Sequence, residues 1–185
     1  VDGVAHDVGR PFLVIATQNP IEQAGTYKLP EAQLDRFMIK TSIGYPDDAA
    51  MARILAGTAE VRAAVPGIVE LDTLLTMAKM ARDAYVNPLV LDYITRLVNA
   101  TRLATEVRLG VSVRGAISAT RLVRAWALAR GRTFVLPDDV QQLAIPLFSH
   151  RIQLEPEAEF DGVTAEAVIG RILLDVEPPR ENAAD

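Results

Sequence analysis

The stretch Leu13–Phe37, with the sequence LVIATQNPIEQAGTYKLPEAQLDRF, is the best guide to the fold of this chain. The continuous apolar run over residues 12–16 is typical of a short strand that is covered on both faces. Pro30 then precedes a polar segment with an acidic residue in its first turn, which predicts a short helix over residues 31–36. A further strand is expected over residues 37–43, so this part of the chain has the pattern of an α/β domain.

Asn19 lies just past the predicted strand and before Pro20, which restricts the asparagine backbone to extended conformations. Ligands of open α/β sheets collect beyond the carboxyl ends of the strands, where a neutral amide can orient an attacking water beside a phosphate. The plainer interpretation is that Asn-Pro is a turn dipeptide. These residues alone leave both interpretations open.

Arg36 ends the short predicted helix, and Phe37 would bury the helix end while the guanidinium points outward. Phosphoryl transfer places charge on non-bridging oxygens, so an arginine from a neighbouring subunit can accelerate it by roughly 10³ to 10⁵. The alternatives are an exposed pair of Asp35 with Arg36, or a cation favoured by the dipole at a helix C-terminus.

Arg114 falls in the first turn of a helix that Ser112 is expected to cap, where the helix dipole disfavours a cation. An anionic ligand at that helix start would explain the arginine, because the guanidinium and the free backbone N–H groups both attract it. Ordinary solvation is the alternative. Arg121 follows on nearly the same helical face and continues the basic character.

No G-x-x-x-x-G-K-[ST] phosphate loop occurs in the 185 residues, although the chemistry suggested above needs one. Asp2-Gly3 is a hairpin signal, and two or three isolated strands do not make a stable sheet. We therefore expect further residues upstream of Val1, and we interpret the chain as part of an enzyme.

The composition indicates a globular chain, because half of the 185 residues are apolar and can build a core. Cysteine is absent, and His6 and His150 lie far apart, so no metal site made of protein side chains is expected. No apolar run approaches the roughly 18 to 20 residues of a membrane span. We expect a soluble, cytoplasmic protein.

After residue 45 the pattern changes to helices alone, which predicts a domain boundary there. Polar caps or prolines indicate the helix starts, with Asp72 and Asn87 among the expected caps. Apolar residues recur at helical spacing from residue 90 down to a stop at Gly110. The expected helices cover residues 49–56, 73–84, 88–109, 113–130, 137–148 and 164–176.

The net charge of −5 is unevenly distributed. Residues 102–132 contain seven arginines and one acid, whereas residues 155–185 contain nine acids and two arginines. The basic segment is either solvated surface or an anion site. A stripe that binds the nucleic-acid backbone is a further interpretation, but Trp126 and Phe134 are its only nearby aromatic residues.

Several motifs follow one another along the chain: VIATQNP (14–20), GTY (25–27), LPEAQLDRF (29–37), GYP (44–46), GVSVR (110–114), GR (131–132), PDDV (137–140) and HR (150–151). In this order they resemble the second half of a MoxR-type AAA+ ATPase, and the run from residue 16 to 37 is the most specific part. The resemblance implies the α/β remnant of an AAA+ nucleotide domain over residues 1–45, followed by an all-α lid over 46–176 and a polar tail over 177–185. The whole chain would be predominantly helical.

By resemblance, Asn19 would be the sensor 1 residue that positions the attacking water. Arg36 would be the arginine finger that reaches the γ-phosphate of the neighbouring subunit, and Arg114 the sensor 2 residue of the lid. The family usually has Gly-Ala-Ser-Pro-Arg-Ala around sensor 2, where this chain has Val113 and Gly115. A complete protein of this family would use ATP and Mg²⁺, whereas this chain alone, without Walker motifs, is expected not to bind them tightly.

The resemblance also implies self-association into a ring, hexameric in this family, that remodels or matures partner proteins, often ones with von Willebrand factor A domains. Two other hypotheses stay open. In one, the helical region is a non-catalytic module that binds protein or nucleic acid through the basic segment Arg102–Arg132. In the other, the chain is a catalytically silent subunit that offers Arg36 to an intact neighbour.

Overall fold

The computed structural model describes residues 3–18, 30–58 and 66–179. The chain divides into two compact units, Val1–Pro30 and Glu31–Asp185. The domain boundary placed near residue 45 stays a prediction, and Asp2 of the proposed hairpin lies outside the described residues.

The first unit has neither helix nor strand among its described residues, so the strand predicted over residues 12–16 is wrong. Its apolar side chains are largely exposed, with Leu13 at 78% and Ile15 at 81%. A strand is defined by hydrogen bonds to a neighbouring strand, and the described part of this unit offers no such neighbour.

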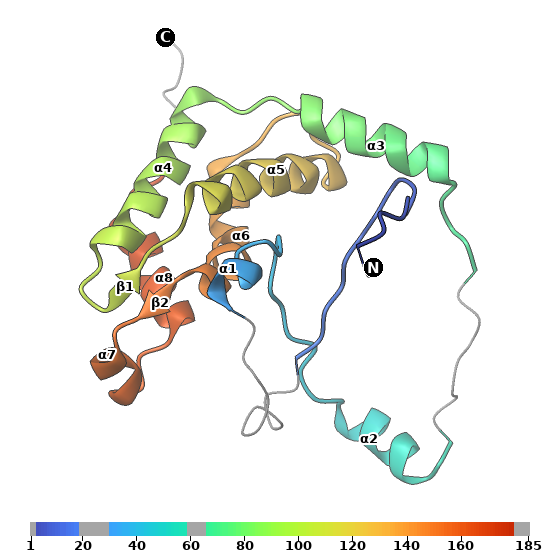
Figure 1. The fold of residues 1–185 in the computed structure, drawn as a ribbon, viewed down its shortest axis with the longest axis horizontal. Helices are drawn as coiled ribbons and strands as arrows, with labels where there is room; N and C mark the ends of the chain where they lie inside the picture. The colour runs from blue at the N-terminus through green and yellow to red at the C-terminus, as the bar shows by residue number, and fades with distance from the viewer. Residues whose placement is uncertain (1–2, 19–29, 59–65, 180–185) are drawn as a thin grey trace. The chain divides into compact units, whose positions relative to one another are not determined.

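The second unit is predominantly helical, as predicted, with one small sheet (Figure 1). Its helices are α1 (Glu31–Leu34), α2 (Asp48–Leu55), α3 (Leu71–Asp83), α4 (Pro88–Leu103), α5 (Val113–Ala129), α6 (Pro137–Phe148), α7 (Pro156–Phe160) and α8 (Ala165–Asp175). The strands β1 (Val107–Leu109) and β2 (Gln153–Leu154) pair antiparallel, and a 3₁₀ helix, η2 (Ser149–Arg151), follows α6.

Side-chain caps begin four of these helices within one residue of the starts that the sequence predicts. The side chains of Asp47, Asn87, Ser112 and Thr164 each accept a hydrogen bond from a backbone N–H in the first turn of α2, α4, α5 and α8. The expected start of α3 is two residues late, because Glu70 occupies its N-cap position. The helix dipole favours an acidic side chain anywhere in the first turn. The sequence therefore does not show whether Asp72 caps α3 or lies inside its first turn.

The predicted helix over residues 88–109 is too long, because α4 ends at Leu103 and the chain then folds back. Gly110 lies against Arg102, where an added Cβ would come within 2.8 Å of the Arg102 Cα atom. Nε of Arg102 donates to the carbonyl oxygen of Val111 at 2.9 Å. The glycine therefore permits a close approach of two segments and does not end a helix.

The strand predicted over residues 37–43 is also wrong, since the structure has no strand there. The backbone N–H of Lys40 instead donates to the carbonyl oxygen of Pro146 at 2.9 Å. Carbonyl groups in the last turn of a helix have no intrahelical partner, so α6 can accept this bond.

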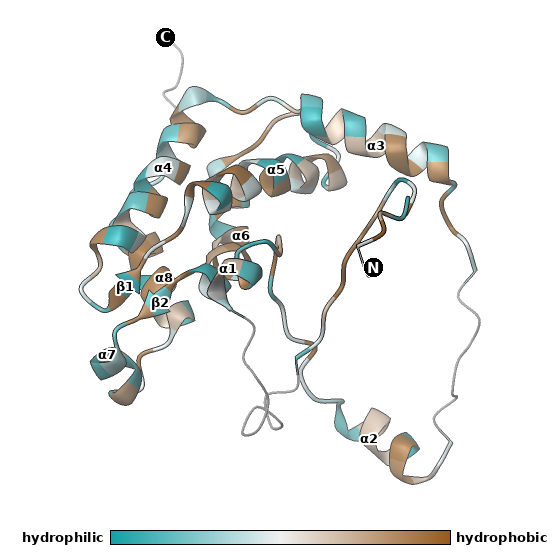
Figure 2. Cartoon of the chain, in the orientation of Figure 1, coloured by the Kyte–Doolittle hydropathy of each residue, from teal (hydrophilic) through white to brown (hydrophobic). Residues whose placement is uncertain are grey.

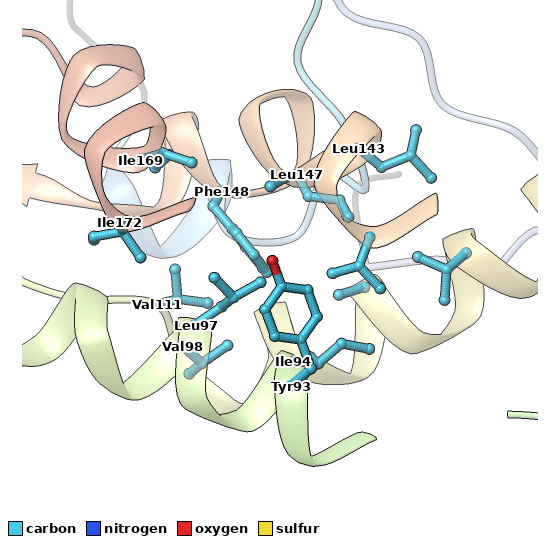
Figure 3. Close-up of a cluster of buried hydrophobic side chains, with 14 of the residues drawn as sticks. Tyr93, Ile94, Leu97, Val98, Val111, Leu143, Leu147, Phe148, Ile169 and Ile172 are labelled. Carbon is cyan, nitrogen blue, oxygen red and sulfur yellow. The ribbon is translucent and has the colours of Figure 1, made fainter. Parts of the chain in front are cut away.

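The core lies between α4, α5, α6 and α8. Tyr93 of α4 is fully buried, in a core to which Leu147 and Phe148 of α6 and Ile169 of α8 also contribute (Figure 3). Burial raises the pKa of the Tyr93 hydroxyl. By contrast, α2 and α3 contain no buried residue, although Figure 2 shows hydrophobic residues on both.

Candidate functional site

Arg151 of η2 holds the main chain on both sides of Arg36. Its side chain is fully buried. Nη1 donates to the carbonyl oxygen and to Oδ1 of Asp35, both at 2.7 Å. Nη2 donates to the carbonyl oxygens of Phe37 at 2.5 Å and Met38 at 3.3 Å. The planar guanidinium suits this role because its donors form a rigid fork.

Asp35 connects this arginine to the start of α5. The hydroxyl of Ser112 lies 3.0 Å from both carboxylate oxygens of Asp35, to which it can donate. The same Ser112 oxygen accepts from the backbone N–H of Gly115 at 3.1 Å, as the N-cap of α5. One carboxylate therefore joins the segment after α1 to both η2 and α5.

Gly115 leaves room for Arg151. A Cβ added at residue 115 would lie 2.5 Å from Cγ1 of Val111 and 3.1 Å from Cδ of Arg151. Both distances are shorter than ordinary van der Waals contacts, and the first would force atoms to move. Gly115, which departs from the family pattern, therefore leaves space that the buried Arg151 side chain needs.

This arrangement joins the segments that carry the predicted site residues Arg36 and Arg114. Arg36 follows Asp35, and Arg114 lies two residues after Ser112, so the hydrogen bond between Asp35 and Ser112 joins the two arginine-bearing segments. Both arginine side chains are exposed and make no hydrogen bond or ion pair among the described residues. They are free to bind an anion.

Asn19, the predicted water-positioning residue, lies outside the described residues. Its role stays a prediction.

His150 lies beside Arg151 and supports the same segment. Its Nε2 atom lies 3.1 Å from the carbonyl oxygen of Phe37, which assigns the proton of the neutral ring to Nε2. Burial lowers the pKa of His150, although the bond to Phe37 opposes this shift. The buried ring is part of the packing around Phe37.

The sequence interpretation missed the part played by Arg151, which it named only as part of the HR motif at residues 150–151. A signal was present, since Arg151 follows Leu147 by one helical turn and so continues the core-facing side of α6. A charged residue at a core position needs buried partners. Their identity could not be inferred, because Asp35 lies 116 residues away in sequence.

Most arginines of the basic segment are engaged within the protein. Of the seven, Arg114 and Arg121 alone have no hydrogen bond, ion pair or ring contact with another described residue. The others bind as follows: Arg102 to Val111, Arg108 to Gln153, Arg124 to the carbonyl of Arg82, Arg130 over the ring of Trp126, and Arg132 to Asp139.

A shallow, mostly apolar pocket of about 660 Å³ lies elsewhere in this unit. It is lined by Tyr85, Leu89, Phe134, Leu136 and Pro179, among others. Neither Arg36 nor Arg114 lines it, so the pocket is separate from the arginine-bearing segments.

Known proteins match this chain along almost its whole length. The AAA lid domain matches residues 99–172, and the ATPase family associated with various cellular activities (AAA) matches residues 1–39. The chaperone MoxR1 of Mycobacterium tuberculosis is 35% identical over 192 residues, which cover 99% of this chain and 51% of that protein. The uncharacterized protein YeaC of Bacillus subtilis is 37% identical over 187 residues, which cover 100% of this chain and 58% of that protein.

A solved structure agrees with these matches. The 2.00 Å crystal structure of a "putative ATPase" from Cytophaga hutchinsonii has a TM-score of 0.84 to this chain at 34% identity, over 95% of this chain and 56% of that one. The chain belongs to the AAA+ ATPases and, within them, to the MoxR type. It spans about half the length of the curated relatives that it matches. Among the described residues, no helix has the length and apolar character needed to cross a membrane.

Proposed function

We propose that this sequence supplies three parts of a ring-forming ATPase that hydrolyses MgATP: the residue that positions water, the arginine that acts on the neighbouring subunit, and the lid. Asn19 serves the nucleotide of its own subunit, Arg36 serves that of the next, and Arg114 senses bound nucleotide. ATP with its Mg²⁺ is the substrate, and the phosphate loop that grips it comes from outside this sequence, which has none.

The observation that carries the proposal is the contrast between the Arg36 backbone and side chain. The carbonyl groups on both sides of Arg36 are bound to buried Arg151, whereas the Arg36 side chain is exposed and unpaired among the described residues. A guanidinium presented from a fixed main chain suits the stabilisation of charge on a transferring phosphoryl group.

The proposal extends to assembly and clients. The ring is hexameric, it lies in the cytoplasm, and it remodels or matures partner proteins, including ones with von Willebrand factor A domains. The supporting observations are the family resemblance and the description of the relative MoxR1 as a chaperone.

The test is Arg36→Ala in the full-length protein, with ring assembly verified by mass photometry. We expect kcat for ATP hydrolysis to fall by about 10³ while the ring stays assembled. Arg53→Ala is the matched control, because Arg53 is an exposed arginine with no side-chain partner among the described residues. A rate for Arg36→Ala within about twofold of wild type in an intact ring would refute the assignment.

Mixed rings test whether Arg36 acts between subunits. Neither Arg36→Ala nor Asn19→Ala rings should hydrolyse ATP efficiently alone. In a mixture, a subunit with intact Asn19 can receive Arg36 from a neighbour, so part of the activity should return. If Arg36 and Asn19 served the same subunit's nucleotide, mixing would restore nothing.

A further inference from the structure

Buried Arg151 fixes the main chain beside Arg36 without touching the Arg36 side chain. Its Nη atoms bind the carbonyl oxygens of Asp35, Phe37 and Met38 at 2.7, 2.5 and 3.3 Å. Nε of Arg151 is itself tied to the carbonyl oxygen of Leu147 in α6 at 2.8 Å. The position of the Arg36 main chain therefore follows the position of α6 and η2.

The same hydrogen-bond group reaches the helix that carries Arg114. Ser112, the N-cap of α5, lies 3.0 Å from each carboxylate oxygen of Asp35, and Asp35 binds Arg151 at 2.7 Å. If the first turn of α5 moved, either the bond between Ser112 and Asp35 would break or the segment that carries Arg36 would move with it. The two arginines are thus linked through one carboxylate.

We propose that Asp35, Ser112 and Arg151 form a clamp that sets the position of Arg36 relative to Arg114. Nucleotide bound at Arg114 in one subunit then changes the position of that subunit's Arg36 relative to the nucleotide of the next subunit. The three clamp residues are positioning residues, since they act through Arg36. The clamp rests on the proposed function, in which the two arginines serve different nucleotides.

The first test is Arg151→Lys in the full-length protein, with ring assembly checked as before. Lysine keeps the charge but replaces the planar fork by one ammonium group, so it cannot hold the same three carbonyl groups. A displacement of about 1 Å at a reacting group lowers the rate about 10²-fold, so we expect a loss of that size in kcat. KM for ATP should not change, because the Arg151 side chain is fully buried and its donors are bound to Leu147, Asp35 and Phe37.

Combining variants separates positioning from an independent role. Adding Arg151→Lys to Arg36→Ala should change kcat by less than about twofold, because displacing residue 36 has no further effect once its guanidinium has been removed. If the two losses multiply, Arg151 acts independently of Arg36 and the clamp is refuted while the proposed function survives. If Arg36→Ala alone leaves the rate unchanged, the proposed function fails and the clamp fails with it.

The link to Arg114 has a separate readout that does not depend on turnover. Hydrogen exchange of the amides of residues 36–38 is measured in the full-length ring with and without a non-hydrolysable ATP analogue. Binding of the analogue should change this exchange in the wild type, and Ser112→Ala should abolish the change. Thr164→Ala is the matched control, because Thr164 also caps a helix, α8, but within the described part of the chain its side chain binds only that helix.

An analogue-dependent change that persists unaltered in Ser112→Ala would refute the coupling. The same conclusion follows if Thr164→Ala abolishes the change as completely as Ser112→Ala, since loss of a cap alone would then suffice. Should Arg151→Lys fail to assemble, the Ser112→Ala comparison still decides whether the segment of Arg36 responds through the clamp.

Discussion

Oδ1 of Asp35 lies 2.7 Å from Nη1 of Arg151, although 116 residues separate the two in sequence. The Arg151 side chain is fully buried, whereas that of Asp35 is 22% exposed. A buried guanidinium is costly unless its donors are satisfied, so this pair selects where the segment after α1 packs. The pair joins the segment that bears Arg36 to the helical lid.

Gly115→Ala should destabilise the protein even though alanine is normally the better helix former. The added Cβ would lie 2.5 Å from Val111 and 3.1 Å from Arg151, and such overpacking costs about 1 to 3 kcal/mol. Urea denaturation of the 185-residue chain measures the change. Gly170→Ala is the matched control, because Gly170 lies inside α8 with no atom within 4 Å of its added Cβ.

We expect Gly170→Ala to stabilise the chain by about 0.5 to 1 kcal/mol, the ordinary helix preference for alanine over glycine. Equal shifts in the free energy of unfolding for both variants would show that Arg151 does not need the space at residue 115.

Asp139→Asn should remove a stabilising ion pair whose strength depends on pH. Asp139 accepts from Arg132 at 2.6 Å and from the backbone N–H of Leu136 at 2.8 Å. Burial tends to raise the pKa of Asp139, but these two bonds outweigh it and hold the pKa below its usual value. A depressed carboxyl pKa stabilises the fold above the unfolded pKa of about 4, and this stabilisation is lost as the pH falls through the folded pKa.

At pH 7 the substitution should cost about 1.5 to 3 kcal/mol, as expected for hydrogen bonds to a charged group. The difference in free energy of unfolding between wild type and Asp139→Asn should begin to shrink below about pH 4, the unfolded pKa, and should shrink further as the pH falls through the lower folded pKa of Asp139. Urea titrations at pH 7, 5 and 3 check this. A difference that stays constant over this range would mean that the charge of Asp139 contributes nothing.

Arg114→Ala should weaken nucleotide binding in the full-length protein without destabilising the chain. Its side chain has no partner among the described residues. Removing it also removes the unfavourable interaction between a cation and a helix N-terminus, which is worth a few tenths of a kcal/mol. We expect KM for ATP to rise about tenfold, equivalent to about 1.4 kcal/mol of lost binding. Arg114→Lys, which keeps the charge, should lose less.

The sensor assignment of Arg114 would be wrong if the alanine variant bound ATP normally in a folded ring. Thermal unfolding of the same variant supplies the control, because a large fall in the melting temperature would point to a structural role instead.

Binding to random DNA tests the hypothesis of a nucleic-acid module. Arg114 and Arg121 are the arginines of the basic segment without a partner among the described residues, so we expect about two phosphates to be neutralised there and the salt slope not to exceed about −1.8. Arg121→Ala should reduce the slope by about 0.9. Arg124→Ala should not, because Arg124 donates to the carbonyl of Arg82.

A slope much steeper than −1.8 that falls on removal of Arg124 would favour the nucleic-acid module. Fluorescence anisotropy over a series of salt concentrations measures these slopes.

Local signals allowed much of the lid to be predicted. The expected caps Asn87 and Ser112 begin α4 and α5, because a capping side chain binds a backbone group only two or three residues away. Gly131, with φ of 74°, likewise follows the end of α5, where a left-handed residue is needed.

The predicted strands failed for the complementary reason. Residues 12–16 have the apolar composition of a strand, but a strand exists only when another strand binds it, and composition does not supply the neighbour. The strand pair β1 and β2 went unpredicted, because Val107 and its partner Leu154 lie far apart in sequence.

The candidate site also depends partly on local sequence signals and partly on tertiary packing. The amino-acid order alone marks Arg36 and Arg114 as candidates, since each depends on a short motif and on its place at a helix end. Tertiary packing decides that Arg151 is buried, that Asp35 binds both Arg151 and Ser112, and that residue 115 must be small. These relations depend on which distant segments meet in space, and hydrogen bonds and excluded volume act between neighbours in space regardless of their separation along the chain.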